Sequence, residues 1–293
     1  MALVIDALVF SLILTAYFSA MALGLNIIFG VLRVVNLSHG SFFMMGSFMA
    51  IALYGTYRFD PLLSLLLILP VFFIIALPLY FALIPRLQKS KDSEIASFVL
   101  FYGVALVIQS IALSLFGTSY YDVPNSSFHV SSIKVLGYYV PFSYIVAALV
   151  SVALIIFAYL YLYHTSLGTQ TRALMSRRET AIVSGINVSM VSAIAFAISI
   201  AIVAASGAFS SEVLFSTSQN IGDIITITSF SIIIIGGLGN PLSTLVGGAI
   251  YGFTYEFASI YIPSWINVIP FLILLVVIVI RPNGVFGGNL REI

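Results

Sequence analysis

The residues that most often carry out catalysis are sparse in this sequence and lie apart. His39, His129 and His164 fall in separate segments, and no H-E-x-x-H pair is present to hold a zinc ion. The chain has no cysteine, which removes thiolate nucleophiles, disulfides and zinc–sulfur sites together. None of its lysines follows a glycine, so there is no phosphate-binding P-loop with which the chain could hydrolyse ATP. The sequence therefore predicts no catalytic residue, no metal site and no cofactor bound by this chain.

Two short motifs are superficially similar to the paired motifs of intramembrane aspartyl proteases. They are Tyr121-Asp122 and Gly237-Leu238-Gly239-Asn240. The chemistry of such proteases needs two carboxylates that share a proton, whereas the second motif carries Asn240 in place of a carboxylate. Asp122 also falls in a stretch expected outside the membrane. The chain is therefore predicted not to be an enzyme.

Polar residues cluster between two glycines near the N-terminus, in the stretch from Gly30 to Ser41. Polar groups at membrane depth are costly unless they face protein or water, and a glycine-interrupted helix in a transporter often marks the solute path. Two other interpretations stay open. The stretch could be a cytoplasmic turn that caps the next helix through Asn36 or Ser38, or a structural break in a helix. The residues predicted to lie near a translocation path are Asn36, Ser38, His39 and Ser41.

Hydroxyl side chains recur at helical spacing further along and could form the facing wall of such a path, although each could equally bond back to its own helix. They are Thr226, Thr228, Ser229 and Ser231. A second interrupted stretch follows them, in which small residues allow close helix packing or line a gate. Its glycines are Gly236, Gly237, Gly239, Gly247 and Gly248. The two interrupted stretches lie toward opposite ends of the chain, as in an internally duplicated transporter.

The third unusual stretch is polar and basic and runs over residues 167–188. As a single helix it would place Ala173, Leu174, Ala181 and Ile182 on one apolar strip beside basic residues. Such a helix suits docking into the groove of a partner protein, or lying on the membrane surface against anionic lipid. Spacing alone leaves both interpretations open.

The rest of the chain predicts the elements that must position these stretches. Hydrophobic residues make up 61% of the 293 residues and charged residues 7%, with a mean hydropathy of +1.17. A soluble protein carries roughly 25% charged residues, so lipid must be the solvent here. About 20 apolar residues cross a bilayer as a helix. The expected spans are 7–30, 40–54, 61–84, 94–116, 141–163, 190–210, 222–238, 243–261 and 265–280.

These runs predict an all-α, polytopic transmembrane helix bundle of about nine spans, with roughly eight to ten possible, and with broken or re-entrant helices. Residues 1–293 are expected to form one transmembrane domain, with a cytoplasmic segment at 167–188. A formal net charge of +1 argues against binding nucleic acid.

Basic residues predict the orientation, because short cytoplasmic loops are rich in Lys and Arg. Three clusters fall on one side of the predicted bundle, which places the stretch 117–140 and the N-terminus outside and the C-terminus in the cytoplasm. The clusters are Arg86, Lys89 and Lys91; Arg172, Arg177 and Arg178; and Arg281 and Arg291.

Taken together, these stretches resemble the permeases of branched-chain amino-acid ABC transporters, the LivH/LivM type, and the LivH-like subunit in particular. The similarity covers nearly the whole chain. Glu179-Thr180-Ala181 with Gly185 is similar to the EAA-x-x-x-G coupling motif of importer permeases, with Thr180 in place of an alanine. The other similar stretches are Gly24-Leu25-Asn26, Phe29 to Asn36, His39-Gly40, Phe98 to Gly117, Gly236 to Pro241 and Arg281 to Gly287.

The resemblance implies a multi-pass permease subunit of an importer in the cell membrane of a prokaryote. Its partners would be a second permease of similar fold, two cytoplasmic ATPases that use ATP, an extracytoplasmic binding protein and membrane lipid. Relatives carry branched-chain amino acids, other amino acids, short amides or urea. The residues expected to couple the chain to the ATPases are Gly168, Arg172, Ala173, Glu179, Ala181 and Gly185.

A stand-alone secondary transporter or channel for a small polar solute is the alternative function. Such a protein normally places ionisable residues inside the membrane to couple transport to an ion. The only acidic candidates are Glu94, near a membrane edge, and Glu256, within an expected span. That scarcity favours a pore driven by other subunits.

Overall fold

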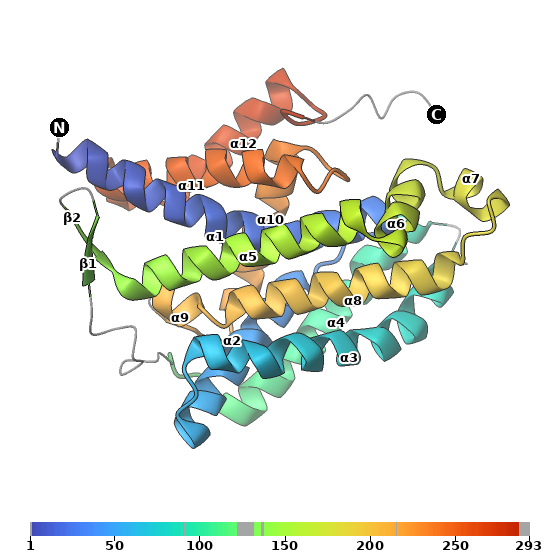
Figure 1. Ribbon diagram of the computed structural model, residues 1–293, viewed down its shortest axis with the longest axis horizontal. Helices are drawn as coiled ribbons and strands as arrows, with labels where there is room; N and C mark the ends of the chain where they lie inside the picture. The colour runs from blue at the N-terminus through green and yellow to red at the C-terminus, as the bar shows by residue number, and fades with distance from the viewer. Residues whose placement is uncertain are drawn as a thin grey trace.

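The computed structural model describes residues 2–88, 90, 92–121, 132–135, 138–214 and 216–286 of the chain. Asp122, His129, Lys89, Lys91, Gly287 and Arg291 lie outside these residues, as does the side chain of Glu94. The described residues form α-helices joined by short loops, together with one 3₁₀ turn and one β-hairpin (Figure 1). The first elements are α1 (Ala2–Leu32), α2 (His39–Tyr57), α3 (Pro61–Leu87), α4 (Ser93–Phe116), β1 (Ser132–Val135), β2 (Tyr138–Pro141) and α5 (Phe142–His164). They are followed by α6 (Ser166–Ser176), α7 (Arg178–Val183), α8 (Val188–Gly207), α9 (Ser210–Val213), α10 (Ile221–Gly236), α11 (Ser243–Tyr261), η1 (Pro263–Trp265) and α12 (Ile269–Ile280).

Each range expected to cross the membrane coincides with a helix, and the all-α membrane bundle is confirmed. By length and composition, α1, α3, α4, α5 and α8 are able to span a bilayer, and α10 and α12 are shorter apolar helices. The large hydrophobic side chains on the outer face of α4 are exposed, including Val99 at 66% and Leu115 at 68%. Such a surface is stable only when it faces lipid or another apolar partner.

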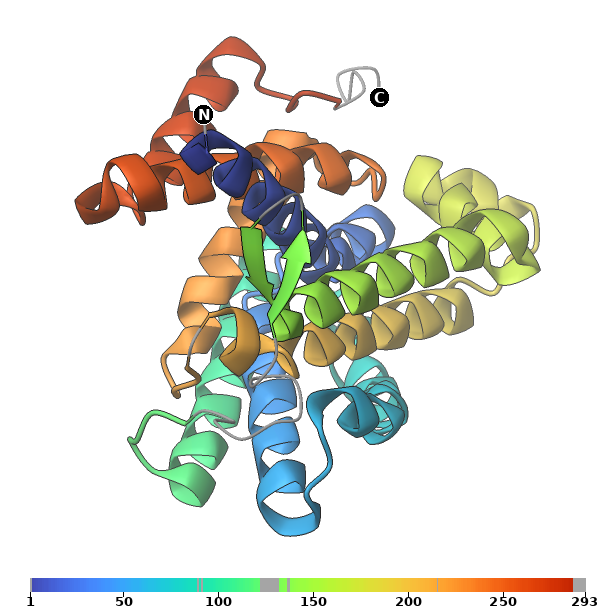
Figure 2. The same cartoon turned by 60° about the vertical axis from the view of Figure 1, so that its left-hand side comes forward.

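The bundle has two distinct ends (Figure 1). The N-terminus, the β1–β2 hairpin and α9 lie at one end, and α6 and α7 lie at the other. Figure 2 shows α6 and α7 gathered at the end of α5 that lies away from the β-hairpin. The β-hairpin begins within the stretch 117–140, where the sequence predicted only a polar connection, and ends one residue beyond it, with Ser132 paired to Pro141.

The core is built around α1 and α8. Nearly every residue of α8 from Val191 onward is buried. Glycines let neighbouring helices approach to backbone contact: a Cβ added to Gly24 of α1 would lie 2.5 Å from the Ser199 carbonyl oxygen, and one added to Gly46 of α2 would lie 2.1 Å from that of Ala204. Since hydrocarbon neighbours gain little from the hydrophobic effect inside a membrane, such close packing is what holds the helices together.

Candidate functional site

The stretch between α1 and α2 returns the chain to the middle of α1. Arg33 adopts a left-handed conformation with φ 52°, which ends α1. The Nε2 atom of His39, the first residue of α2, lies 2.9 Å from the carbonyl oxygen of Met21, eleven residues before the end of α1. The break therefore places the start of α2 deep inside the bundle rather than at a surface turn.

All four residues predicted near a translocation path are buried in this break. Asn36, Ser38 and His39 have no exposed surface, and Ser41 is 1% exposed. Asn36 Oδ1 accepts hydrogen bonds from the backbone N–H of Ser38, at 3.1 Å, and from its hydroxyl, at 2.7 Å. Ser38 occupies the N-cap position of α2, but its hydroxyl is directed to Asn36 and not to the helix. The polar groups of this stretch thus hold a tight turn in place.

Two atoms of the break have no hydrogen-bond partner among the described residues, namely Asn36 Nδ2 and His39 Nδ1. Buried polar atoms without a partner are uncommon because each costs free energy. They mark the places where this segment could bind something that is not part of the chain.

Only some of the hydroxyl side chains of α10 face the break between α1 and α2. Thr226 Oγ1 accepts from the backbone N–H of Gly40 at 3.0 Å and lies 2.9 Å from the carbonyl of Gly222. Ser231 donates to the carbonyl of Ile227 in its own helix, and Ser229 Oγ is buried without a partner among the described residues. Thr228 instead lies 3.4 Å from the hydroxyl of Tyr251. The row of four hydroxyls is therefore divided among different environments.

The second interrupted stretch contacts the C-terminal part of α1, just before the first interrupted stretch begins. The buried side chain of Asn26 contacts the loop between α10 and α11 at four points. Its Nδ2 lies 3.3 Å from the carbonyl of Gly237, 2.8 Å from that of Asn240 and 2.8 Å from Thr244 Oγ1, and its Oδ1 accepts from the Gly239 N–H at 2.7 Å. One amide thus satisfies three backbone groups of a loop that is only partly exposed.

The glycines of this second stretch serve close approaches and unusual backbone angles. A Cβ added to Gly236 would lie 2.2 Å from the Ser243 carbonyl oxygen, and one added to Gly247 would lie 2.0 Å from that of Ile232. Gly248 packs in the same way against Ser19 of α1. Gly237 and Gly239 have φ values of 130° and 78°, which favour glycine.

The segment after α12 closes this region. The N–H groups of Val285 and Phe286 donate to the carbonyls of Ile235 and Gly236 at the end of α10, each at 2.9 Å. Gly284, with φ 79°, lies against the backbone of Gly237. Three stretches that are far apart in the sequence, around Asn26, residues 236–241 and residues 284–286, therefore pack together at the C-terminal end of α1.

The segment predicted to couple the chain to ATPases forms two helices and not one. Arg177 is extended, with φ −145° and ψ 106°, and separates α6 from α7. The predicted single apolar strip is therefore wrong: Leu174 and Ala181 are buried at 2% and 3% exposure, whereas Ile182 is 54% exposed. The physical reason is that α6 folds back onto α5, so that each short helix buries its own face.

Gly168 makes that fold-back possible. A Cβ added to Gly168 would lie 1.9 Å from the Tyr161 carbonyl oxygen of α5. Thr165 caps α6 by accepting from the Gly168 N–H at 2.9 Å, and Tyr161 OH lies 2.8 Å from Thr171 Oγ1. The guanidinium of Arg172 stacks over the ring of Tyr163 at 4.6 Å. The base of this segment is therefore rigidly attached to α5.

The tip of the segment is exposed. Glu179 is exposed, Ala173 is half-buried, and Val183 at the end of α7 is 89% exposed. Gly185 follows with φ 78°, and a Cβ added to it would meet no atom within 4 Å. The Ile186 N–H donates to the Ala181 carbonyl at 3.1 Å, which is the pattern of a glycine-terminated helix. Gly185 therefore allows the chain to turn, and no described residue packs closely against it.

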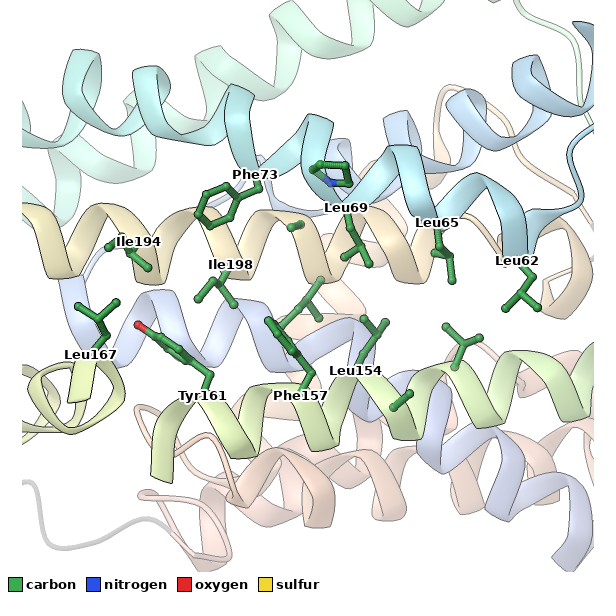
Figure 3. Close-up of a pocket in the computed structure, with 15 residues that line it drawn as sticks. Leu62, Leu65, Leu69, Phe73, Leu154, Phe157, Tyr161, Leu167, Ile194 and Ile198 are labelled. Carbon is green, nitrogen blue, oxygen red and sulfur yellow. The ribbon is translucent and has the colours of Figure 1, made fainter. Parts of the chain in front are cut away.

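An apolar cavity of about 690 Å³ lies between α3, α5 and α8 (Figure 3). Its wall includes Leu69, Phe73, Leu154, Phe157 and Ile198. Tyr161 carries the only polar side-chain group among the described lining residues, and its hydroxyl is already bonded to Thr171. This cavity offers a polar solute no hydrogen bond.

The sequence profile of a family described as "branched-chain amino acid transport system / permease component" matches residues 7–278. The chain belongs to this family. The family consists of transport permeases, which are not enzymes.

Individual permeases support the assignment along almost the full length. The chain is 28% identical to a probable branched-chain amino acid transport permease protein LivH of Methanocaldococcus jannaschii, over 93% of this chain and 89% of that protein. It is 23% identical to the high-affinity branched-chain amino acid transport system permease protein LivH of Escherichia coli K12, over 92% and 91%. It is also 23% identical to the corresponding protein BraD of Pseudomonas aeruginosa, over 97% and 95%. No solved structure matches the chain significantly.

The structure of this permease adds residues that the sequence did not single out. Asn26 was noticed only as part of a signature, because its four contacts lie 211 to 218 residues away along the chain. The exposed apolar tip at Val183 also had no signal, since an isolated valine beside polar residues does not show whether it is buried. The presence of an amide side chain within an apolar, helical run was the one indication in the sequence that Asn26 has a structural role.

Proposed function

We propose that this permease is the LivH-like membrane subunit of an ATP-driven importer for branched-chain or other amino acids or a similar small polar solute. It pairs with a second permease of similar fold, and the pair is driven by two cytoplasmic ATPases and supplied by an extracytoplasmic binding protein. ATP is used by the ATPases and not by this chain. The observation that carries this proposal is the family match over residues 7–278, and three of the stretches that resemble the family, around Asn26, residues 236–241 and residues 281–286, meet at the end of α1.

The two ends of the bundle fit one orientation. Arg178 donates to Gln88 Oε1 at 2.9 Å, so the basic segment around α7 lies beside the basic end of α3. The positive-inside rule then places this end in the cytoplasm, and the N-terminus and the β-hairpin at the other end outside. The C-terminus follows into the cytoplasm in this proposal.

The exposed tip of α7 suits docking to an ATPase. Ile182 and Val183 present apolar surface beside Glu179 at the cytoplasmic end of the proposed orientation. A short helix that presents an apolar tip is a common way to fill a groove on a partner. The rigid attachment of α6 to α5 at Gly168 would carry a movement of the tip into the bundle.

The break at residues 36–41 is proposed to lie near the translocation path. In the described conformation it is closed, because its side chains bond to the chain's own backbone. Asn36 Nδ2 and His39 Nδ1 remain available to a solute when the helices around the break separate. The glycines at 236–239 would then act as a packing surface or gate beside it.

Reconstitution tests the proposed function directly. The chain is co-expressed with the permease, ATPase and binding-protein genes of its own operon, purified by a tag on this chain, and placed in liposomes. We expect the ATPases to co-purify and leucine uptake to require both internal ATP and the binding protein. Uptake by the purified chain alone, without ATP, would contradict the proposal and favour a secondary transporter.

A further inference from the structure

A second cavity, of about 680 Å³, lies between α10, α11 and the start of α12. It is separate from the apolar cavity of Figure 3, with which it shares no lining residue. Its volume falls within the range of roughly 300–1,000 Å³ that is usual for sites of small ligands. The loop that follows α9 forms part of its rim, so it opens toward the end of the bundle that carries α9 and the β-hairpin (Figure 1).

One wall of this cavity is aliphatic and belongs to the first half of α10. Ile221 and Ile225 are buried, whereas Ile224 and Ile227 are 62% and 56% exposed on the open side. Branched side chains of this kind pack well against another branched aliphatic group. This wall therefore favours a ligand with an apolar part of similar size.

The floor is aromatic and carries hydroxyl groups. Phe18 of α1 packs edge-on against Tyr251 and Tyr255 of α11, with ring centroids 5.1 and 5.5 Å apart. The Tyr251 hydroxyl lies 3.4 Å from Thr228 Oγ1 of α10, at the long limit of a hydrogen bond. This pair of hydroxyls can therefore redirect to a ligand at little cost.

The rim is polar and uncharged. It contains two serines, two asparagines and a tyrosine, namely Ser216, Ser218, Asn220, Asn267 and Tyr120. Among the described lining residues there is no Asp, Glu, Lys or Arg. A zwitterion has no net charge, so its ammonium and carboxylate groups can be served by neutral donors and acceptors, whereas an ion would find no counter-charge.

The rim is held in a defined position. Thr217, between the two rim serines, pairs with Tyr121 through backbone hydrogen bonds of 2.8 and 2.9 Å. Its hydroxyl lies 2.6 Å from that of Ser210, and both bond to Ser47 of α2. The polar groups of the rim are therefore presented by a loop that is anchored on two sides.

We infer that this cavity is an entry site at which the permease receives a neutral amino acid with a branched aliphatic side chain, which α10 contacts while the polar rim binds the amino and carboxylate groups. The inference rests on the proposed function and assigns part of the selectivity to the permease itself. With no fixed charge in the described lining, the site binds weakly and releases its ligand readily, as a transit site must.

Narrowing the aliphatic wall tests the inference through selectivity. Ile224→Phe is compared with the parent complex for maximal uptake of leucine and of alanine, each at saturating loaded binding protein, so that the affinity of the binding protein does not enter. We expect leucine uptake to fall by about tenfold and alanine uptake by less than about twofold, because a misfit of one methylene or more in an apolar pocket costs about 10-fold or more. Ile111→Phe on the exposed face of α4 is the matched control and is expected to leave the ratio unchanged.

An equal loss of uptake of both amino acids, or no change in the uptake of either, in an assembled Ile224→Phe complex would overturn the inference.

A second variant combines Thr228→Val with Tyr251→Phe and removes the hydroxyl groups of the floor, with Thr254→Val as its control. Thr254 lies outside the lining of the cavity and bonds to the Ile250 carbonyl of its own helix. We expect the double variant to slow uptake of both amino acids severalfold while the control transports at the parent rate, and parent-rate uptake by the double variant would count against the site.

Protection from a thiol reagent tests occupancy independently, because the chain contains no cysteine of its own. Ser218→Cys on the rim should react more slowly with a methanethiosulfonate reagent when leucine is supplied during transport, and Ser132→Cys in the exposed β-hairpin at the same end of the bundle should react at an unchanged rate. No protection in a complex that transports leucine would overturn the inference and leave the proposed function standing. A parent complex that transports neither amino acid would contradict the proposed function, and this inference with it.

Discussion

Two glycine-bearing turns of this permease look alike in sequence and behave oppositely in the structure. Gly237 and Gly239 turn the chain between α10 and α11, where Gly237 is buried, Gly239 is half-buried and the buried side chain of Asn26 contacts the loop on several sides. Gly185 turns the chain after α7, where no described atom lies within 4 Å of an added Cβ. All three residues have positive φ. The difference shows that a glycine turn reports backbone geometry, and that its surroundings decide whether the turn holds the bundle together or presents a surface to a partner.

The largest effect is expected where the close glycine contacts between α10 and α11 are disrupted. Gly247→Leu would place a side chain within 2.0 Å of the Ile232 carbonyl oxygen and force α10 and α11 apart. We expect no folded, monodisperse protein, since overpacking in a core is one of the few changes that can cost more than about 4 kcal/mol. Size-exclusion chromatography of detergent-solubilised protein measures this. Gly103→Leu on α4, where an added Cβ meets nothing within 4 Å, is the control, and equal recovery of both variants would refute the close packing.

Removing the amide of Asn26 is expected to have the next largest effect. Asn26→Leu removes the partner of the part-buried Gly239 N–H and Asn240 carbonyl and of the buried Thr244 hydroxyl. Each unsatisfied buried group costs about 1–3 kcal/mol, so the thermal unfolding temperature should fall markedly. Asn187→Ala removes only the exposed side-chain cap of α8 and should cost about 1 kcal/mol. If the two variants unfold at the same temperature, the loop does not depend on Asn26.

The outer turn should behave differently, with a large effect on transport and a small one on stability. Gly185→Leu places a branched side chain at φ 78°, a strain of about 1–3 kcal/mol, and should misalign α7 without preventing membrane insertion. We expect transport to be lost and ATP hydrolysis to become independent of the loaded binding protein. Asn tolerates this conformation better, so Gly185→Asn should keep most of the activity. Normal substrate-stimulated ATP hydrolysis by an assembled Gly185→Leu complex would contradict the coupling role.

Substitutions in the break between α1 and α2 are expected to have intermediate effects on stability and on transport. Substituting Asn36 and His39 singly with Leu should lower transport while the complex still assembles, because each change removes a polar group near the proposed path. Asn36→Leu also removes both hydrogen bonds from Ser38, and His39→Leu removes the one to the Met21 carbonyl. The cost in stability should be about 1–2 kcal/mol for each. Uptake assays and pull-down of the ATPases measure the two effects. Parent-rate transport by both variants would mean that the segment is only a turn.

Labelling of single cysteines tests the orientation with little expected effect on stability. Ser132→Cys in the hairpin and Ser184→Cys after α7 both replace exposed residues at opposite ends of the bundle. An impermeant maleimide applied to intact cells should label the first and not the second. Labelling of Ser132→Cys only after permeabilisation would reverse the proposed orientation and place α7 away from any cytoplasmic ATPase.

The sequence by itself determined the helices and the class of protein. Long apolar runs fold into helices inside a membrane because each backbone group must find its hydrogen bond within the segment, and this requirement is local. The boundaries of α2, α5 and α11 therefore lie within a few residues of the predicted spans. The family resemblance was also available from the sequence, because the signature stretches are continuous along it.

Only the tertiary structure decided which of the polar and glycine-containing stretches meet. Asn26 reaches Thr244 across 218 positions, and no spacing rule extends over that distance. The predicted single helix at 167–188 divides at Arg177 because Gly168 lets α6 pack against α5, which depends on the shape of a neighbouring helix. The second cavity likewise combines residues from α1, α10, α11 and α12. Such contacts depend on how helices pack, and packing is set by the whole bundle rather than by any one segment.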